Sequence, residues 1–197
     1  MDVTRFEYRI FGPSLIQEQQ RLAALSDPVP AELRRRISHE YYLIPKQENR
    51  FNVKIRDGSL DIKYLLQTVD GFERWQPRIK IDFPLNKRDL RGEVFAALDI
   101  DLQTDSRETF SMRQFIDLLK SEDYIRVVKV KKMRRAYTVK NVICEFASLN
   151  LEKIRTTTIS AESNDLARLK KVVEELGIGN FENTNYIRAI RQIAGMK

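Results

Sequence analysis

The sequence has few of the residues that build disulfide frameworks, metal clusters or catalytic triads. It contains one cysteine, Cys144, and one histidine, His39, in 197 residues. A single cysteine excludes an intrachain disulfide and a cysteine-based zinc site. The histidine has no triad or metal-binding pattern around it, and Cys144 lies in an apolar segment typical of a small buried residue. Both are interpreted as structural.

Long apolar runs are also absent. None approaches the roughly 18 residues that a membrane-spanning helix needs, and the first residues, MDVTRFEYRIF, lack the apolar core of a signal peptide. With seven glycines, six prolines and no internal repeat, the chain shows no linker between domains. We therefore expect a single domain over residues 1–197, a cytoplasmic location and no membrane partner.

Positive charge is in excess. Thirty-five Lys and Arg residues against 28 Asp and Glu residues leave a formal net charge of +7. Hydrophobic residues make up 42% of the chain, which is enough for a globular core. The charge favours an anionic partner, which could be a nucleic acid, a phosphorylated small molecule or an acidic surface.

Alternating apolar and charged side chains predict half-buried strands. In FNVKIR, residues 51–56, Lys54 and Arg56 lie between apolar positions. A tight Asp-Gly-Ser turn then leads to a second strand that carries Lys63, which predicts a hairpin. Further strands are predicted at residues 4–11, 39–45, 74–85, 124–139, 141–152 and 155–163.

Helical periodicity appears between and after these strands. It predicts helices at residues 14–25, 87–98, 109–121, 164–178 and 183–195. The order of strands and helices indicates an α+β protein with an antiparallel sheet, whose apolar face the helices cover. Two architectures fit: an open sheet with a solvated charged face, or a β-barrel with helices outside and a charged lumen.

In the barrel, strand parity sends many charged side chains to one interior. Close like charges repel in a medium of reduced dielectric, so such a cluster needs counter-ions. A phosphate chain would satisfy the cations, and the acids could hold Mg²⁺ or Mn²⁺ beside it. The inward cations are Arg5, Arg9, Lys54, Arg56, Lys63, Arg78, Lys80, Lys132 and Arg134, and the inward acids are Glu7, Asp61, Asp82, Glu145 and Glu162.

The order of several motifs resembles that of a known family. A first strand with alternating charges, a basic pair on an inner strand, a Lys on the next strand, a Lys-x-Arg-x-x-Tyr motif and a closing acid follow one another. They correspond here to Arg5-Phe-Glu7-Tyr-Arg9, Lys54 with Arg56, Lys63, Lys132-Met-Arg134-Arg-Ala-Tyr137 and Ser160-Ala-Glu162. Together they are similar to the CYTH superfamily, the triphosphate tunnel metalloenzymes, which include class IV adenylyl cyclases, thiamine triphosphatases and inorganic tripolyphosphatases.

The resemblance implies an antiparallel barrel whose lumen binds a triphosphate-containing small molecule with Mg²⁺ or Mn²⁺ and hydrolyses it. It implies no specific catalytic residue. The phosphate-binding residues would be Arg9, Lys54, Arg56, Lys63, Arg78, Lys132 and Arg134, and the metal-binding residues would be Glu7, Glu145 and Glu162.

Other functions stay open. Arg5 and Lys80 stand where the family has acids, which favours a catalytically weakened polyphosphate- or nucleotide-binding module. A class IV-type adenylyl cyclase and a basic nucleic-acid-binding protein are further alternatives. The sequence lacks a stacking-aromatic or helix-turn-helix motif, so a nucleic acid is not the expected partner. The oligomeric state is left open between monomer and homodimer.

Overall fold

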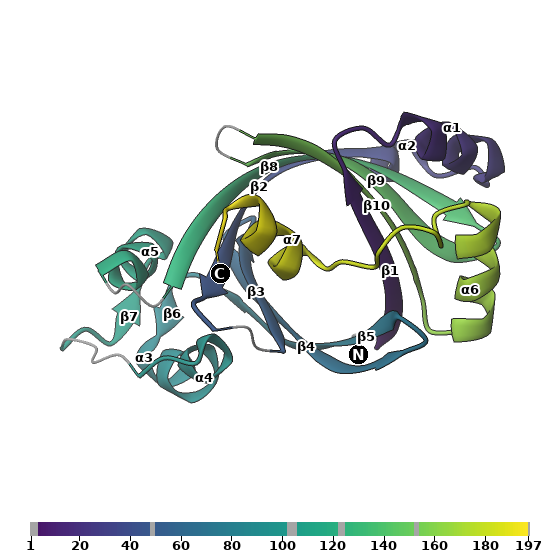
Figure 1. Ribbon diagram of the computed structural model, residues 1–197. Helices are drawn as coiled ribbons and strands as arrows, with labels where there is room; N and C mark the ends of the chain where they lie inside the picture. The colour runs from purple at the N-terminus through teal and green to yellow at the C-terminus, as the bar shows by residue number, and fades with distance from the viewer. Residues whose placement is uncertain (1–3, 48–49, 102–105, 122–124, 152–153, 197) are drawn as a thin grey trace.

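The computed structural model describes residues 4–47, 50–101, 106–121, 125–151 and 154–196. Eight antiparallel strands close into a barrel in the order β1–β10–β9–β8–β2–β3–β4–β5, and β5 pairs with β1 (Figure 1). The predicted α+β barrel is therefore confirmed. The strands are β1 (Arg5–Gly12), β2 (Arg35–Pro45), β3 (Phe51–Arg56), β4 (Ser59–Val69), β5 (Phe72–Asp82), β8 (Ile125–Val139), β9 (Val142–Leu151) and β10 (Ile154–Ser163).

The remaining elements surround or enter this barrel. The predicted helix at residues 87–98 is divided into short pieces, and the one at 109–121 begins with a strand that pairs as a separate ribbon. The pieces are β6 (Leu85–Asn86), α3 (Lys87–Asp89), the π-helix η1 (Leu90–Val94), α4 (Phe95–Leu98), β7 (Thr109–Phe110) and α5 (Met112–Ser121). The other helices are α1 (Ile16–Leu25), α2 (Ala31–Arg34), α6 (Leu166–Glu175) and α7 (Tyr186–Ile193). Within the described ranges no helix combines the length and apolar character needed to cross a membrane.

Outward apolar side chains of the strands attach the outer helices. Tyr8 and Ile10 of β1 share one buried cluster with Leu22 of α1 and Leu169 of α6. On the other side of the barrel, Val53 and its neighbours in β3 and β4 share a second cluster with α4 and α5. The period-two alternation predicted from the sequence thus sends one face of each strand to helices and the other face inward.

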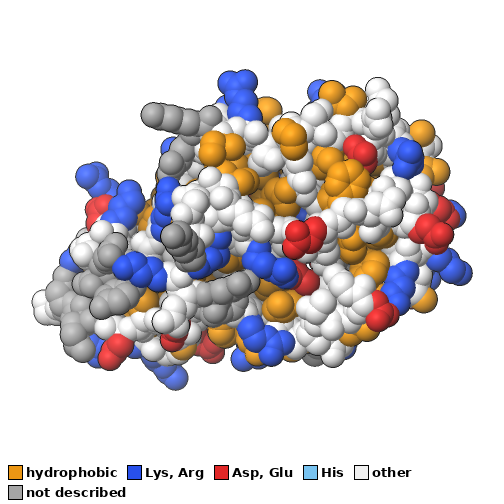
Figure 2. Space-filling view, viewed as in Figure 1, with side chains coloured by type: hydrophobic (Ala, Val, Ile, Leu, Met, Phe, Trp, Pro, Cys, Tyr) orange, Lys and Arg blue, Asp and Glu red, His pale blue; other side chains and the backbone are white. Residues whose placement is uncertain are grey.

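Helix α7 lies across one end of the barrel rather than on its outer wall (Figure 1). Tyr186 and Ile190 of α7 belong to a cluster with inward-facing Tyr42, Val130 and Leu149. The Tyr186 ring stacks on Tyr42 with 5.1 Å between centroids. In the space-filling view from the same side, atoms fill the centre of the ring that the ribbon leaves open (Figure 2). The apolar part of the barrel interior is therefore occupied by the chain itself.

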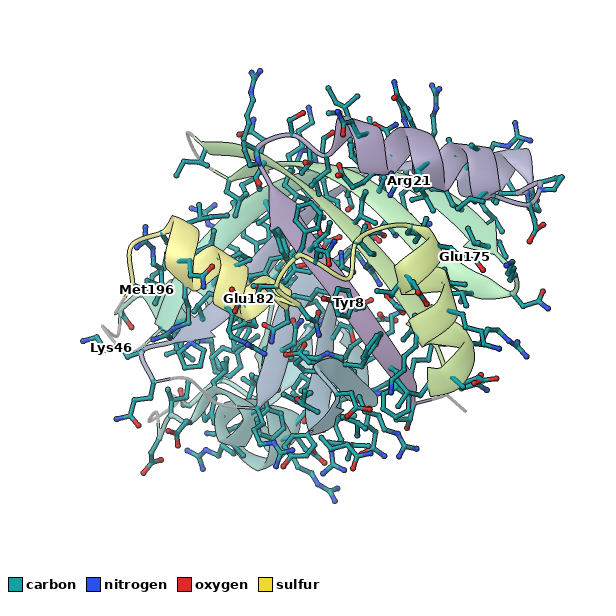
Figure 3. All side chains as sticks on the ribbon, turned by 45° about the vertical axis from the view of Figure 1, so that its right-hand side comes forward. Tyr8, Arg21, Lys46, Glu175, Glu182 and Met196 are labelled. Carbon is teal, nitrogen blue, oxygen red and sulfur yellow. The ribbon has the colours of Figure 1, made fainter. Side chains whose placement is uncertain are left out.

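Hydrogen bonds hold α7 and the segment before it in place. The Tyr8 hydroxyl donates to the Phe181 carbonyl at 2.6 Å, and Figure 3 shows Tyr8 beside the segment that carries Glu182. At the other end of α7, Arg191 donates to the carbonyls of Pro45 and Lys46 at 2.6 and 2.7 Å. These contacts anchor both ends of the helix that closes the barrel.

Replacing Ile190 with Ala should lower the free energy of unfolding by about 2–5 kcal/mol, because it leaves a cavity among buried aromatic and aliphatic side chains. Ile190 is 1% exposed. The measurement is urea denaturation followed by circular dichroism. Ile16→Ala is the control, since Ile16 is 60% exposed and its loss should change stability by no more than about 0.5 kcal/mol. Equal effects of the two substitutions would contradict this role of α7.

Candidate functional site

A charged cavity of about 290 Å³ opens at the end of the barrel away from α7. Its walls come from β1, β3, β4, β5 and β10, and Trp75 and Pro77 are the apolar members of the lining. Charged side chains make up the rest. They are Arg5, Glu7, Arg56, Asp61, Lys63, Lys80 and Glu162.

Arg9 lies below this cavity and joins three carboxylates. Its side chain is 5% exposed, and its Nε atom is 2.5 Å from Glu7 Oε1. Its terminal nitrogens lie 3.5 Å from Glu145 Oε1 and 3.9 Å from Glu162 Oε1. Burial lowers the pKa of Arg9, but these carboxylates outweigh it and the pKa is raised. Arg9 also stands over the ring of Tyr186, 4.6 Å from its centroid, so it connects the charged interior to α7.

Glu145 forms ion pairs with two cations of β8. Lys132 Nζ is 2.7 Å from Glu145 Oε1, and Arg134 Nε is 3.8 Å from Oε2. Burial raises the pKa of Glu145, but Lys132, Arg9 and Arg134 outweigh burial and hold it at about 2. The buried Nε of Arg134 has no hydrogen-bond partner among the described residues. This orphaned donor suits an anion, because a phosphate oxygen would supply the missing acceptor.

Lys54 occupies the opposite wall. Its Nζ atom is 3.9 Å from Glu40 Oε2 and 3.8 Å from Asp61 Oδ2. Burial lowers the pKa of Lys54 to about 8, with Glu40 acting against the shift and Arg56 and Lys63 reinforcing it. Lys54 therefore remains mostly protonated at neutral pH. Its charge is available to an anion, but burial makes that charge costly without one.

Two buried acids were missed by the sequence interpretation. Glu40 of β2 is 1% exposed and accepts hydrogen bonds from Ser38 at 2.9 Å and Tyr42 at 3.0 Å. The alternation of the HEYY segment could have revealed it, because Glu40 lies on the opposite face of the strand from His39 and Tyr41. Glu40 offsets part of the excess of cations over acids that the sequence predicted for the barrel interior.

Glu73 of β5 is the second missed acid, at 2% exposure. Trp75 Nε1 donates to it at 3.1 Å, Asn185 donates at 2.9 Å, and Arg188 forms an ion pair with it. Asn185 also caps α7, accepting from the Arg188 backbone N–H at 3.0 Å. Glu73 therefore anchors α7 to β5. The residues that contact each other are more than 100 positions apart, so the local sequence around Glu73 does not predict this role.

The predicted metal-binding residues divide into two kinds. Glu7 and Glu162 are direct partners across β1 and β10, and both line the cavity. Burial and the neighbouring Glu7 raise the pKa of Glu162, whereas burial of Glu7 is outweighed by Arg9 and Lys63, so its pKa is lowered. Glu145 does not line the cavity and pairs with Lys132 and Arg134 of β8. All three acids also pair with Arg9. Among the described residues, no group of three or more acids, histidines or cysteines forms a metal cluster.

Two facing carboxylates beside an anion site suit Mg²⁺ or Mn²⁺. Mg²⁺ is usually bound through one or two carboxylates together with phosphate oxygens of the substrate, rather than by a full protein cage. The pair Glu7 and Glu162 fits that pattern, and a cation between them would also relieve their repulsion. Metal binding by Glu7, Glu145 and Glu162 stays a prediction.

Arg78 is not brought to the cavity. A register shift between β4 and β5 pairs Lys63 with Pro77 and Ile62 with Ile79, which leaves Arg78 without a partner in the ladder. Its guanidinium lies near the outward ring of Tyr64, 5.9 Å from the centroid. The β-bulge thus interrupts the strict alternation on which the inward assignment of Arg78 depended.

Comparisons with known proteins agree with this barrel. No protein-family model and no curated protein matches the sequence. Among solved structures, HpAC1 from Hippeastrum, a candidate adenylyl cyclase with a dominant triphosphatase activity, has a TM-score of 0.51 at 15% identity, covering 98% of this chain and 97% of that one. A candidate adenylate cyclase from Bacillus halodurans has a TM-score of 0.51 at 10% identity, covering 93% and 95%.

PH1819 from Pyrococcus horikoshii matches with a TM-score of 0.50 at 14% identity, covering 95% of this chain and 99% of that one. At these identities the matches show the fold. The barrel has the architecture of the CYTH, or triphosphate tunnel, proteins, as the motifs predicted.

The carboxylate of Glu145 should make stability depend on pH. Its folded pKa of about 2 lies below the ordinary value of 4.5, so its contribution of about 3 kcal/mol is complete above pH 4.5 and is lost as the pH falls toward 2. Glu145→Gln should lower the free energy of unfolding at neutral pH, and the gap to the original protein should narrow over that range. Urea denaturation at several pH values measures both curves.

Glu175→Gln is the control for this experiment. Glu175 pairs with Lys140 on the surface, with both side chains at least one-third exposed. Removing that pair should cost no more than about 1 kcal/mol. Parallel pH curves for the original protein and Glu145→Gln would show that Glu145 is not held as an anion.

Proposed function

We propose that this barrel binds a triphosphate-containing small molecule in its charged cavity and hydrolyses it with a divalent metal ion. The observation that carries the proposal is the meeting of cations from β1, β3, β4 and β5 with the facing carboxylates of Glu7 and Glu162 in one cavity. The triphosphatase activity of HpAC1, which has the same fold, supports it.

Two tiers of cations would bind the phosphates. Arg5, Arg56, Lys63 and Lys80 line the open cavity. Deeper in the barrel, most N···O distances between cations and carboxylates are 3.5–3.9 Å. These distances are longer than those of good hydrogen bonds, so N–H donors of the deeper cations remain available to phosphate oxygens. These deeper residues are Arg9, Lys54, Lys132 and Arg134.

The closed end of the barrel orients the ligand. Tyr186 and its neighbours in α7 fill the far end, so a ligand would enter from the side of Arg5 and Lys80. The terminal phosphate would therefore lead, and the organic group or remaining phosphate would stay at the mouth. This arrangement brings the phosphate end toward Glu7 and Glu162.

Glu7 and Glu162 would hold Mg²⁺ or Mn²⁺. When bound, such an ion offsets charge at the reacting phosphorus and favours attack by water. The residues of the chain contribute positioning: cations on several strands hold the phosphate oxygens, and the closed end limits the entry of further water.

Binding without turnover is the second candidate. Lys132 and Arg9 already hold Glu145, so fewer carboxylates are available to a metal than the resemblance implied. In that case the protein would be a polyphosphate- or nucleotide-binding module. The two functions differ in one observable, the release of phosphate.

A phosphate-release assay with Mg²⁺ or Mn²⁺ across tripolyphosphate, thiamine triphosphate, ATP and GTP tests the proposal, together with a thermal-shift titration of tripolyphosphate. Turnover should fall at least about 100-fold in Glu162→Gln, which removes a metal-binding charge, while stabilisation by tripolyphosphate persists. Stabilisation without turnover in the original protein would support the binding module. If the protein neither releases phosphate nor is stabilised by tripolyphosphate, both candidates are refuted.

Arg56 and Arg78 offer a matched pair of substitutions on neighbouring parts of the barrel. Arg56→Ala should weaken tripolyphosphate binding about 10- to 100-fold, since a hydrogen bond to a charged group contributes about 1.5–3 kcal/mol. Arg78→Ala should change it less than about two-fold, because Arg78 lies beside Tyr64 outside the cavity. Isothermal titration calorimetry measures both. A larger loss in Arg78→Ala would contradict this placement of the site.

A further inference from the structure

The outer wall formed by β2, β8, β9 and β10 carries a second set of cations. Along β8, Lys132 points inward and is buried, whereas Lys131 and Met133 on either side of it are exposed. Cross-strand pairing places further outward residues beside them. We call this surface the outer basic face and define it by Arg35, Ile37, Lys131, Met133, Arg135 and Arg155.

No described helix covers this face. Figure 1 shows the arch of β8 and β2 between α5 at one side and α1 with α2 at the other. At its centre Ile37 and Met133 are direct partners, and they are 64% and 48% exposed. Adjacent exposed apolar side chains on a bare sheet are typical of an interaction surface.

Two arginines of the face oppose each other directly, and two further cations share a row. Arg35 is the direct partner of Arg135, and Lys131 stands in one row with Asn150 and Arg155 across β8, β9 and β10. Like charges directly opposite across strands are destabilising. Within the described residues, none of Arg35, Lys131, Arg135 and Arg155 forms an ion pair. An anionic partner would relieve this repulsion.

Two grooves border the central apolar pair. One of about 470 Å³ is lined by Ile37, Tyr41, Ile55 and Met112 together with the charged residues Arg56, Asp57 and Lys129. The other groove, of about 480 Å³, lies on the side of Met133 and is lined also by Lys131, Arg155 and polar residues such as Ser148 and Asn150. Each groove combines at least one exposed apolar side chain with at least one cation.

This combination of grooves and cations favours a protein over a nucleic acid as the partner of the outer basic face. A phosphate backbone would use the cations but would leave the grooves lined by Ile37 and Met133 unfilled, and protein–DNA interfaces are more polar than protein–protein ones. An apolar centre with a charged rim is the anatomy of a protein interface, in which Met and Arg are enriched.

We infer that the outer basic face docks an acidic segment of a partner protein. Its carboxylates would pair with Lys131, Arg135 and Arg155, and its aliphatic or aromatic side chains would occupy the grooves beside Ile37 and Met133. This inference does not depend on the proposed function, since these side chains point away from the charged cavity.

Fluorescence anisotropy of the full chain with a labelled peptide of Glu and Asp residues and interspersed leucines tests the inference. Lys131→Glu combined with Arg135→Glu should weaken binding about ten-fold or more, and added salt should weaken it further. Arg88→Glu combined with Lys171→Glu makes the same charge change on exposed positions of α3 and α6, and should change binding less than about two-fold.

The apolar part of the inference has its own readouts. Met133→Ser in the protein, or Ser in place of the leucines in the peptide, should each weaken binding about three-fold or more. Circular dichroism and urea denaturation of every variant report whether the barrel is intact. No peptide binding, or peptide binding equally affected in the control variant, would overturn the inference. So would a single-stranded or duplex RNA that binds more tightly than the peptide and loses affinity in Lys131→Glu combined with Arg135→Glu.

Discussion

The interior of this barrel depends on the buried guanidinium of Arg9. It holds Glu7, Glu145 and Glu162, which come from three neighbouring strands, and it stands over the ring of Tyr186 in α7. Charges taken out of water are tolerated only where partners replace the lost hydration. Arg9 supplies that partner to three carboxylates at once, so the charged and apolar parts of the interior meet at one residue.

The separation of the interior into an apolar part and a charged part determines where the candidate site lies. Tyr42, Val130 and Leu149 make one end of the interior apolar, and α7 covers them, whereas the other end keeps an open charged cavity. The charged cavity therefore lies at the end of the barrel that α7 does not cover. The cations around it are only partly neutralised by acids, including the buried Glu40, and this partial neutralisation suits a ligand that brings its own negative charge.

A single strand can serve two surfaces. In KVKKMRR, residues 129–135, Lys132 and Arg134 point to the interior, while Lys131, Met133 and Arg135 belong to the outer basic face. The density of positive charge on β8 is therefore divided between two surfaces, the interior proposed to bind a small anion and the outer face proposed to bind an acidic partner. Net charge alone could not separate them, because it is a property of the whole chain.

The sequence by itself determined the eight long strands, the α+β class and the inward direction of residues such as Lys54 and Lys132, because side-chain direction in a strand alternates with a period of two. Only the tertiary structure decided the rest. A β-bulge removed Arg78 from the cavity, and contacts across more than 100 residues committed Glu73 to α7. Bulges, closure and helix seating depend on pairing between distant segments, and a local pattern carries no information about which segments will meet.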